Sequence, residues 1–294
     1  MDSRSRRGSI VLEDAEILEH AAFAGNQYIL RVRAPRAAQR AEPGSFAHLT
    51  CDVSVPLRRP LSIMRADREH GSLEFLYKPI GAGLAKLAER TPGERVSVLA
   101  PIGRGFEPDP ARPRLLAIGG GVGIPPMIFL AERAREHPDL HTVVLMGSEV
   151  PFPFELAPSR LAVPGVPAEA SHGVALLERR GIASRLASNA GFPGSFRGHV
   201  PALGRSVLAA LSAAQLTQTQ VFGCGPEPML RATAALAHEF AVPCQLALEE
   251  YMACGVGGCA GCTVLLHTEQ GQAMKRVCVD GPVFDAAQVY PRRL

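Results

Sequence analysis

The sequence predicts a multi-domain β plus α/β protein with a small cysteine-bearing module at its C-terminal end. Two changes of pattern and one cysteine group lead to this prediction. Short apolar alternations extend from Ile10 to about Phe106, strands, glycine turns and helices follow, and four of the seven cysteines gather after residue 250. With 294 residues, the chain is long enough for two or three domains, each with its own core.

The first part of the chain has the pattern of an all-β domain. Apolar alternations such as "QYILRVRA", "GSLEFLYKPI" and "ERVSVLAPIG" are separated by Gly and Pro. Alternation with a period of two indicates strands buried on one face, and frequent turn residues indicate that the strands are short. We expect antiparallel strands that close a barrel or a sandwich over residues 8–108.

The pattern changes after "EPDPARP" to that of a parallel α/β layer. "RLLAIGGG", "PPMIFLAERAREH" and "HTVVLMGS" indicate strand, glycine turn, helix and strand, which make a βαβ unit. A further helix, the strand "QVFGCG" and another helix extend the layer. We expect this domain over 109–244, with 151–201 forming loops around one or two short elements.

The four C-terminal cysteines are Cys254, Cys259, Cys262 and Cys278, spaced C-x4-C-x2-C-x15-C. A C-x4-C-x2-C loop with a distant fourth cysteine is the plant-type [2Fe-2S] arrangement. The glycines of this loop allow the backbone angles and free amides that a wrapped cluster needs. Structural zinc is the alternative, although zinc modules usually present two short cysteine pairs. We expect a [2Fe-2S] domain over 245–294 with these four ligands.

Two glycine turns predict a site for a dinucleotide. Each turn follows a strand and begins a helix, where backbone amides and the helix dipole favour a phosphate. Neither turn has the G-x-G-x-x-G fingerprint with a following acidic residue, so an ordinary Rossmann dehydrogenase is disfavoured. The candidate residues are Gly119, Gly120, Gly121, Val122, Gly123, Cys224, Gly225 and Pro226.

Two stretches of the first domain carry features of a flavin site. In "RRPLSI", Arg59 offers a fixed cation for a pyrophosphate, and Ser62 offers a hydroxyl for a flavin ring nitrogen. In "LYKPIGAGLAKL", Gly81 and Gly83 precede an expected helix, which gives a second place where backbone amides can meet phosphate.

The order of these motifs carries a resemblance to a known family. "RPLSI", "GGGVGIPPM", "CGPEPML", the cysteine loop and "RVCVDGPVF" occur in this order along nearly the whole chain. The chain resembles the electron-transfer subunit of class 1B dihydroorotate dehydrogenase, within the ferredoxin-NADP reductase superfamily. The resemblance implies an FAD-binding antiparallel β-barrel, an NAD-binding α/β domain and a [2Fe-2S] domain.

The resemblance also implies roles for individual residues. The superfamily often has an aromatic residue where Leu61 stands and a threonine where Leu84 stands, so two flavin contacts differ here. The two glycine turns would line the nicotinamide nucleotide, NAD or NADP, and Ser62 would act directly at the flavin. The residues implied for FAD are Arg59, Pro60, Leu61, Ser62, Leu76, Tyr77, Lys78, Gly83 and Leu84.

These cofactors together predict an electron converter. A flavin accepts a hydride as two electrons and releases them singly, whereas a [2Fe-2S] centre carries one at a time. The resemblance implies a flow from dihydroorotate to an FMN-containing catalytic subunit, then through [2Fe-2S] and FAD to NAD, in pyrimidine biosynthesis. The expected partner is that catalytic subunit, in a hetero-oligomer.

Other functions stay open or are disfavoured. An NAD(P)H-dependent reductase serving a ferredoxin, hydrogenase or oxygenase shares the same modules, and a zinc-stapled binding module is a non-enzymatic alternative. A net charge of +3 with scattered basic residues gives no reason to expect nucleic acid. The N-terminus has no apolar core after its arginines, and the longest uncharged run is too short and too rich in Gly and Pro for a membrane span, so we expect a soluble cytoplasmic protein. Cytoplasmic thiols stay reduced, which favours metal binding over disulfides at the clustered cysteines.

Overall fold

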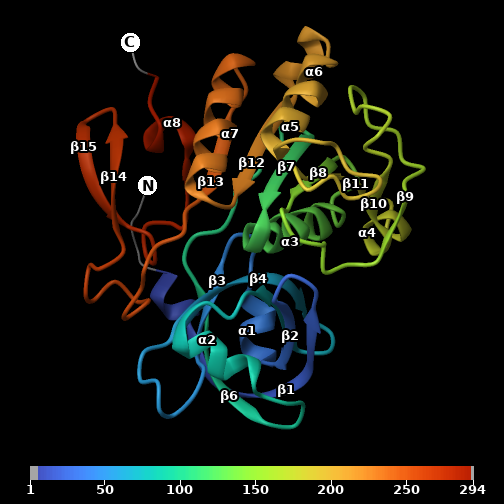
Figure 1. The fold of residues 1–294 in the computed structure, drawn as a ribbon. Helices are drawn as coiled ribbons and strands as arrows, with labels where there is room; N and C mark the ends of the chain where they lie inside the picture. Colours follow the sequence, from blue (N-terminus) through green and yellow to red (C-terminus); the bar gives the residue numbers. More distant parts are fainter. Residues whose placement is uncertain (1–5, 293–294) are drawn as a thin grey trace.

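The computed structural model describes residues 6–292, in which a β-barrel, an α/β sheet and a cysteine-bearing segment pack together (Figure 1). Six antiparallel strands close the barrel in the order β1-β2-β5-β4-β3-β6. The expected β-barrel is therefore confirmed. Its strands are β1 (Val11–Phe23), β2 (Gln27–Arg33), β3 (Phe46–Thr50), β4 (Arg59–Asp67), β5 (Ser72–Tyr77) and β6 (Arg95–Ile102).

Alternation along each strand fills the barrel. Leu61 and Ile63 of β4, with Leu73, Phe75 and Tyr77 of β5, belong to one buried core inside it. The residues between them face outward, because successive side chains of a strand point to opposite faces. A short 3-10 helix, η1 (Arg6–Ser9), precedes the barrel. Two α-helices, α1 (Pro35–Arg40) and α2 (Gly81–Ala88), pack on the barrel.

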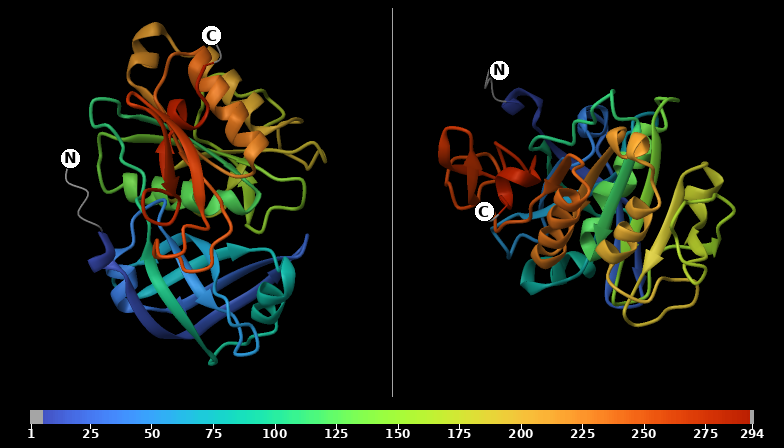
Figure 2. Two further views of the ribbon diagram at one scale, coloured as in Figure 1. Left: turned by 90° about the vertical axis from the view of Figure 1, so that its left-hand side faces the viewer. Right: turned by 90° about the horizontal axis from the view of Figure 1, so that it is seen from above.

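The α/β part contains a six-stranded sheet in the order β11-β8-β7-β12-β13-β16. All of its pairings are parallel except that of β16 with β13. Helix α3 lies between this sheet and the barrel, while α5 and α7 pack together on the opposite face (Figures 1 and 2). The first strands and helices are β7 (Arg114–Gly120), η2 (Gly121–Gly123), α3 (Ile124–Ala134), β8 (His141–Gly147), α5 (Val200–Ala209), α6 (Ala213–Thr217), β12 (Thr219–Cys224) and α7 (Glu227–Glu239).

The proline-rich stretch 151–201 has more regular structure than the sequence predicts. A two-stranded hairpin, a short helix and a strand that extends the main sheet at its edge occupy it. The strands of the hairpin have three residues each, too short for a periodic pattern to reveal them. These elements are β9 (Leu156–Pro158), β10 (His172–Val174), α4 (Ala175–Arg179) and β11 (Ala183–Ala187).

The C-terminal segment contributes to the sheet as well as forming its own hairpin. The expected boundary between residues 244 and 245 lies within β13, and β16 returns to pair with β13 at Leu246 and Phe284. Residues 293 and 294 lie outside the described residues. No helix within 6–292 combines the length and apolar composition needed to cross a bilayer. The elements are β13 (Cys244–Ala247), β14 (Thr263–Thr268), β15 (Gly271–Arg276), β16 (Val283–Asp285) and α8 (Ala286–Val289).

Candidate functional site

Strand β4 presents the expected flavin residues on both of its faces. Leu61 lies in the barrel core and is 7% exposed, so its side chain is turned away from the outer face. Pro60 and Ser62 are half-buried on that outer face. Ser62 is opposite Phe46 of β3 in the strand register. The hydroxyl of Ser62 is therefore available to a ligand that lies against the outside of the barrel.

Arg59 lies against the beginning of helix α2. A Cβ added to Gly83 would come 2.8 Å from Arg59 Nε and 3.1 Å from Nη2, so a larger residue at this position would displace the guanidinium. Helix α2 has no side-chain N-cap and no acidic residue in its first turn. Its free amides and the guanidinium face the same place, which is the arrangement that a pyrophosphate requires.

The other expected flavin residues have mixed orientations. The Tyr77 ring points into the barrel core, where its hydroxyl is 2.8 Å from His20 Nε2. Leu76 faces outward and is buried against the α/β part, whereas Lys78 is half-buried after the end of β5. Leu84 in α2 packs against the barrel core. Tyr77 and Leu84 can thus offer a flavin only their backbone or the edge of their side chains.

The two glycine turns lie next to each other at the carboxyl edge of the sheet. Strand β7 pairs with β12 so that Gly119 is opposite Cys224. A Cβ on Gly123 would lie 2.4 Å from the backbone carbonyl of Cys224, so these turns touch through bare backbone. The carboxyl ends of adjacent parallel strands are where such sheets bind nucleotides.

Gly120 and Gly225 of the two turns both lie against Met229 of α7. A Cβ on Gly120 would collide with the Met229 sulfur of α7 at 2.5 Å, and one on Gly225 would lie 2.8 Å from the Met229 methyl group. The open positions are Gly121, with nothing within 4 Å of an added Cβ, and half-buried Val122. Pro226 caps α7 at the same edge.

Cys224 is a buried, protonated thiol. It is 1% exposed, and burial, with the charge of Glu249 nearby, raises its pKa well above the ordinary value. A thiol held in this way does not act as a nucleophile at neutral pH, because the thiolate is the reactive form. Cys224 therefore serves as a small side chain at the turn, in keeping with a binding position.

One hydrophobic core joins the flavin face to the nucleotide turns. Leu76 and Met64 from the outer face of the barrel are buried together with Ile124 of α3 and Cys224 of β12. Residues expected to contact flavin and residues expected to contact nucleotide thus pack in the same core. The two expected sites are neighbours across the junction between barrel and sheet.

The four clustered cysteines lie as two pairs rather than around one point. Cys262 and Cys278 have their sulfurs 3.3 Å apart, and Cys254 and Cys259 are joined because the Cys259 amide donates to the Cys254 sulfur at 3.4 Å. In residues 6–292, no three Cys, His, Asp or Glu side chains converge on one metal position. A [2Fe-2S] rhomb takes two thiolates on each iron, so two pairs fit it better than a single tetrahedral zinc.

Backbone amides of the loop already point at the sulfurs. The Gly261 amide donates to the Cys259 sulfur at 3.4 Å, and the Cys278 amide donates to the Cys262 sulfur at 3.5 Å. Arg276 fastens the loop from the other side, because its Nη1 donates to the Gly257 carbonyl at 2.9 Å. Such outer contacts orient thiolate ligands and stabilise their charge.

The pKa values of Cys254 and Cys278, one from each pair, are shifted in opposite directions. Partial burial raises the pKa of Cys254, but donors in the loop, chiefly the Cys259 amide, outweigh it and lower the pKa to about 6. Burial and the neighbouring Cys262 thiol raise the pKa of Cys278 to about 12. Metal binding at Cys278 must therefore displace a proton, which couples assembly of the site to pH.

His48 is a residue near these sites that the sequence reasoning missed. It lies on β3, is 0% exposed, and has its ring next to Gly255 of the cysteine loop. Burial and the charge of Arg58 lower its pKa to about 4, so the imidazole is neutral at physiological pH. The alternation in "FAHLT" could have identified a histidine on the outward face, but no motif includes it.

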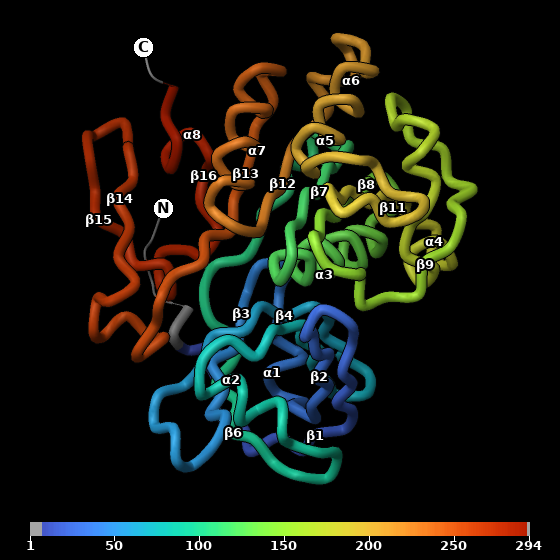
Figure 3. The backbone as a smooth tube through the Cα atoms, viewed as in Figure 1, coloured from blue at the N-terminus to red at the C-terminus, as the bar shows by residue number. Residues whose placement is uncertain are grey.

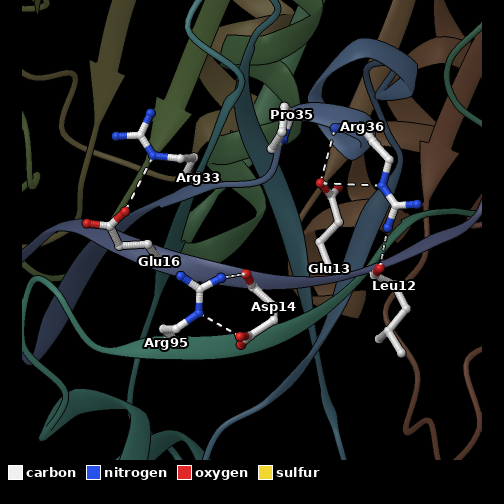
Figure 4. Close-up of a pocket in the computed structure, with 8 residues that line it drawn as sticks. All are labelled: Leu12, Glu13, Asp14, Glu16, Arg33, Pro35, Arg36 and Arg95. Atoms are coloured by element: carbon white, nitrogen blue, oxygen red, sulfur yellow. Dashed lines mark hydrogen bonds and ion pairs between the residues drawn. The ribbon is translucent and has the colours of Figure 1, made fainter.

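A shallow charged groove on the outside of the barrel has no role in this arrangement. Strand β1 and its neighbours form it, and its charges are paired with each other: Arg95 with Asp14 at 2.6 Å and Arg33 with Glu16 at 3.5 Å (Figure 4). Because these charges are already neutralised, the groove offers little to a charged ligand. The glycine turns and cysteine pairs contribute no residue to it.

Solved structures define the class of protein. The chain superposes with a TM-score of 0.71 at 20% identity, covering 94% of this chain and 90% of the other, on the structure described as "Insights into flavin-based electron bifurcation via the NADH-dependent reduced ferredoxin-NADP oxidoreductase structure". The "Ferredoxin reductase in carbazole 1,9a-dioxygenase" gives a TM-score of 0.61 at 21% identity, covering 80% of this chain and 67% of that one. The fold is that of the ferredoxin-NADP reductases.

Sequence comparison then identifies the family. The chain is 33% identical over 283 residues to the "Dihydroorotate dehydrogenase B (NAD(+)), electron transfer subunit" of Bacillus caldolyticus, covering 94% of this chain and 98% of that protein. The subunit of the same name from Shouchella clausii is 32% identical over 281 residues, covering 93% and 96%. The family model for the "Iron-sulfur cluster binding domain of dihydroorotate dehydrogenase B" matches residues 249–290. The chain belongs to the family of dihydroorotate dehydrogenase B electron transfer subunits.

Proposed function

We propose that this chain passes electrons between NAD and a dihydroorotate dehydrogenase catalytic subunit, through FAD and a [2Fe-2S] centre that it binds itself. The observation that carries this proposal is the adjacency of the three candidate sites. The outer face of β4 and the nucleotide turns share a core that includes Leu76 and Cys224, and β3 separates β4 from the cysteine loop. Membership of the family supports the same function.

FAD would bind across the outer face of β4 and the N-terminus of α2. Bound FAD supplies the chemistry of accepting a hydride and releasing single electrons. The guanidinium of Arg59 and the free amides at Gly83 hold the pyrophosphate, because both present donors with no competing carboxylate. The half-buried Ser62 hydroxyl would donate a hydrogen bond to a flavin ring nitrogen.

The nicotinamide nucleotide would lie over the touching glycine turns. The open residues Gly121 and Val122 would offer their backbone to the ligand, and the contact of Gly123 with Cys224 holds the two turns together. The nicotinamide ring would lie toward the junction where Leu76 and Cys224 belong to one buried core. These buried side chains would limit the access of water to the junction.

The [2Fe-2S] centre would bridge the two cysteine pairs. Cys254 and Cys259 would hold one iron, and Cys262 and Cys278 the other, with loop amides donating to the sulfurs. Cys262 and Cys278 are buried, whereas Cys259 is exposed. The Cys259 side would therefore be the side from which a partner could reach the centre.

The cysteine loop also supports a docking face for the partner. The loop descends from β13 beside the barrel, at the edge of the molecule (Figure 3). Tyr251 is 94% exposed and Val256 is 37% exposed, and both flank the cysteines. Exposed aromatic and aliphatic side chains mark interaction surfaces. We infer that an FMN-containing catalytic subunit covers this loop in a hetero-oligomer in the cytoplasm, where all seven free thiols stay reduced.

Spectroscopy and metal analysis test the proposal directly. Anaerobically purified protein should contain one FAD and about two irons and two sulfides per chain, and its flavin and iron–sulfur absorption should bleach on addition of NADH. Mixed with a dihydroorotate dehydrogenase catalytic subunit, it should support NAD reduction by dihydroorotate. A colourless protein with zinc and no sulfide would contradict the cofactor assignment, and reduction of ferredoxin without any response to the catalytic subunit would contradict the partner.

A further inference from the structure

Strand β3 pairs with β4, which carries the candidate flavin residues, and also contacts the cysteine loop at His48. Its register with β4 places Phe46 opposite Ser62 and His48 opposite Pro60. Ala47 and Leu49 point into the barrel core, so Phe46 and His48 point outward on the same face as Ser62. Phe46 is buried in a core with Cys262 and Cys278. His48 thus lies on the side of β3 that meets the loop.

The ring of His48 is buried, and its nitrogens lack a well-formed hydrogen bond. Its exposed fraction is 0%, and in the part of the chain that the structure describes neither Nδ1 nor Nε2 has a partner at hydrogen-bond distance and angle, although backbone groups of Arg58, Cys254 and Met252 lie near enough to raise the pKa of the ring. The carbonyl of His48 is bonded by Arg58, but this bond belongs to the backbone. A buried polar group without a partner costs about 1–3 kcal/mol, so each such group in a native protein calls for a ligand or another explanation.

The edge of the ring that carries Nδ1 faces the cysteine loop. A Cβ added to Gly255 would come 2.6 Å from Nδ1 and 3.3 Å from Cε1. Gly255 also has a φ of 68°, a conformation that favours glycine. The loop therefore approaches His48 as closely as backbone can, at the residue that directly follows Cys254.

We propose that His48 is a positioning residue of the iron–sulfur centre: its Nδ1–H donates a hydrogen bond to a sulfur of the bound cluster and holds the loop against β3. The inference rests on the proposed binding of the cluster at the four cysteines. The loop brings the backbone of Cys254 and Gly255 to this side of the ring, and a cluster bound at Cys254 would add sulfur acceptors there. A hydrogen bond to sulfur stabilises the reduced, more negative cluster, which raises its reduction potential.

A matched pair of substitutions isolates the hydrogen bond. Asn and Leu have the same branched shape, but only His48→Asn keeps an N–H donor at the δ position, while His48→Leu removes it. Each variant is purified anaerobically in the full chain with its cofactors. The readouts are iron and sulfide content, the electron paramagnetic resonance spectrum of the reduced cluster, and the midpoint potentials of cluster and flavin in a dithionite titration.

The two variants are expected to differ, because only His48→Leu removes the N–H donor while both keep a branched side chain of similar shape. His48→Leu should shift the cluster potential in the negative direction, alter the resonance spectrum and make the cluster about 10-fold more easily lost to chelators. His48→Asn should restore most of the wild-type potential and spectrum. The flavin potential should stay unchanged in both variants.

Three outcomes would overturn the inference. If the cluster potential is equal in wild type and His48→Leu, His48 does not donate to the cluster. If both variants lose the cluster to chelators equally fast and show the same potential shift, His48 has a role in packing alone. A shift of the flavin potential instead of the cluster potential would assign the ring to the flavin. If wild-type protein carries no iron–sulfur signal, the proposed function fails together with this inference, whereas a normal wild-type signal confines the failure to His48.

Discussion

Among the four clustered cysteines, Cys259 is exposed, so its substitution should affect metal binding without disturbing the packing of the fold. Its sulfur accepts a hydrogen bond from the Gly261 amide, and its own amide donates to the Cys254 sulfur. The buried Cys262 and Cys278 pack within a hydrophobic core, so replacing them would disturb packing as well as ligation. Substitution of the exposed Cys259 therefore tests ligation of the cluster more directly than substitution of Cys262 or Cys278.

We expect Cys259→Ala to lose the iron–sulfur centre while keeping FAD and the fold. One missing ligand leaves an iron with an open coordination position in contact with solvent, which destabilises the centre. Iron and sulfide analysis, flavin absorption and circular dichroism measure the three properties. Cys244→Ala is the control, because Cys244 is a buried thiol of β13 outside the cysteine loop. Full iron content in Cys259→Ala would remove this residue from the ligand set.

Arg59 is the second residue with a clear individual role. Its Nη1 donates to the carbonyls of Leu57 and Arg58, which fixes the guanidinium, while Nε and Nη2 face Gly83. A cation held in place by backbone carbonyls loses little side-chain entropy when it binds an anion. The Arg59 guanidinium is therefore preorganised to bind phosphate oxygens.

We expect Arg59→Ala to weaken FAD binding about 10- to 100-fold, because a hydrogen bond to a charged group contributes about 1.5–3 kcal/mol. Equilibrium titration of the apoprotein with FAD measures the change. Arg95→Ala is the matched control, since Arg95 pairs with Asp14 in the charged groove on the outside of the barrel (Figure 4). Similar affinities for both variants would argue against a pyrophosphate at Arg59.

At the scale of elements, the two glycine turns depend on each other. The β7–α3 turn and the β12–α7 turn touch where Gly123 meets the Cys224 carbonyl. The parallel pairing of β7 with β12 brings them together, although about a hundred residues separate them in the chain. The nucleotide site is therefore a property of the strand order.

We expect Gly123→Ala to destabilise the protein by about 1–3 kcal/mol and to abolish most of its NADH affinity. The new Cβ would overlap the Cys224 backbone at 2.4 Å and drive the two turns apart. Thermal unfolding and NADH titration measure the two effects. Gly8→Ala is the control, because Gly8, like Gly123, lies outside the left-handed φ region but has nothing within 4 Å of an added Cβ. Equal NADH affinity in both variants would contradict the paired-turn site.

At the scale of the whole molecule, a buried ionic network fastens the barrel to the α/β part. Arg65 of β4 pairs with Glu74 of β5 at 2.9 Å and with Glu132 of α3 at 2.8 Å. Glu132 also pairs with Arg180, which follows α4, at 2.6 Å. Pairing with the two glutamates outweighs burial and raises the pKa of Arg65, so the arginine stays charged. This network lies beside the core that joins the flavin and nucleotide sites.

We expect Glu132→Gln to lower the free energy of unfolding by about 3 kcal/mol, because Arg65 would keep a buried charge with one partner removed. The opening of the barrel–sheet junction should also slow the reduction of flavin by NADH. Urea unfolding measures the first effect, since urea does not screen charges as guanidinium salts do. Glu155→Gln, in an exposed pair with Arg179, is the control. Unchanged stability and flavin reduction would contradict a fastening role for the network.

Much of this architecture could be predicted from local patterns. Alternation in segments such as "QYILRVRA" predicts barrel strands, glycine turns after apolar runs predict strand-to-helix junctions, and the C-x4-C-x2-C spacing predicts the cluster loop. Local patterns failed where an element is short or its partner is remote. The hairpin of β9 and β10 has three residues in each strand, and β16 joins the sheet only because β13 offers an open edge.

By itself, the sequence determined the three-part order, the four cysteines and the two glycine turns, because spacing and periodicity within a short stretch of chain fix these features. Only the tertiary structure decided that Leu61 and Tyr77 point into the barrel, that Gly123 touches Cys224, and that His48 meets Gly255. These contacts depend on barrel closure, strand order and the return of the C-terminal segment to the sheet. They join residues far apart in the chain, and no local pattern encodes such distances.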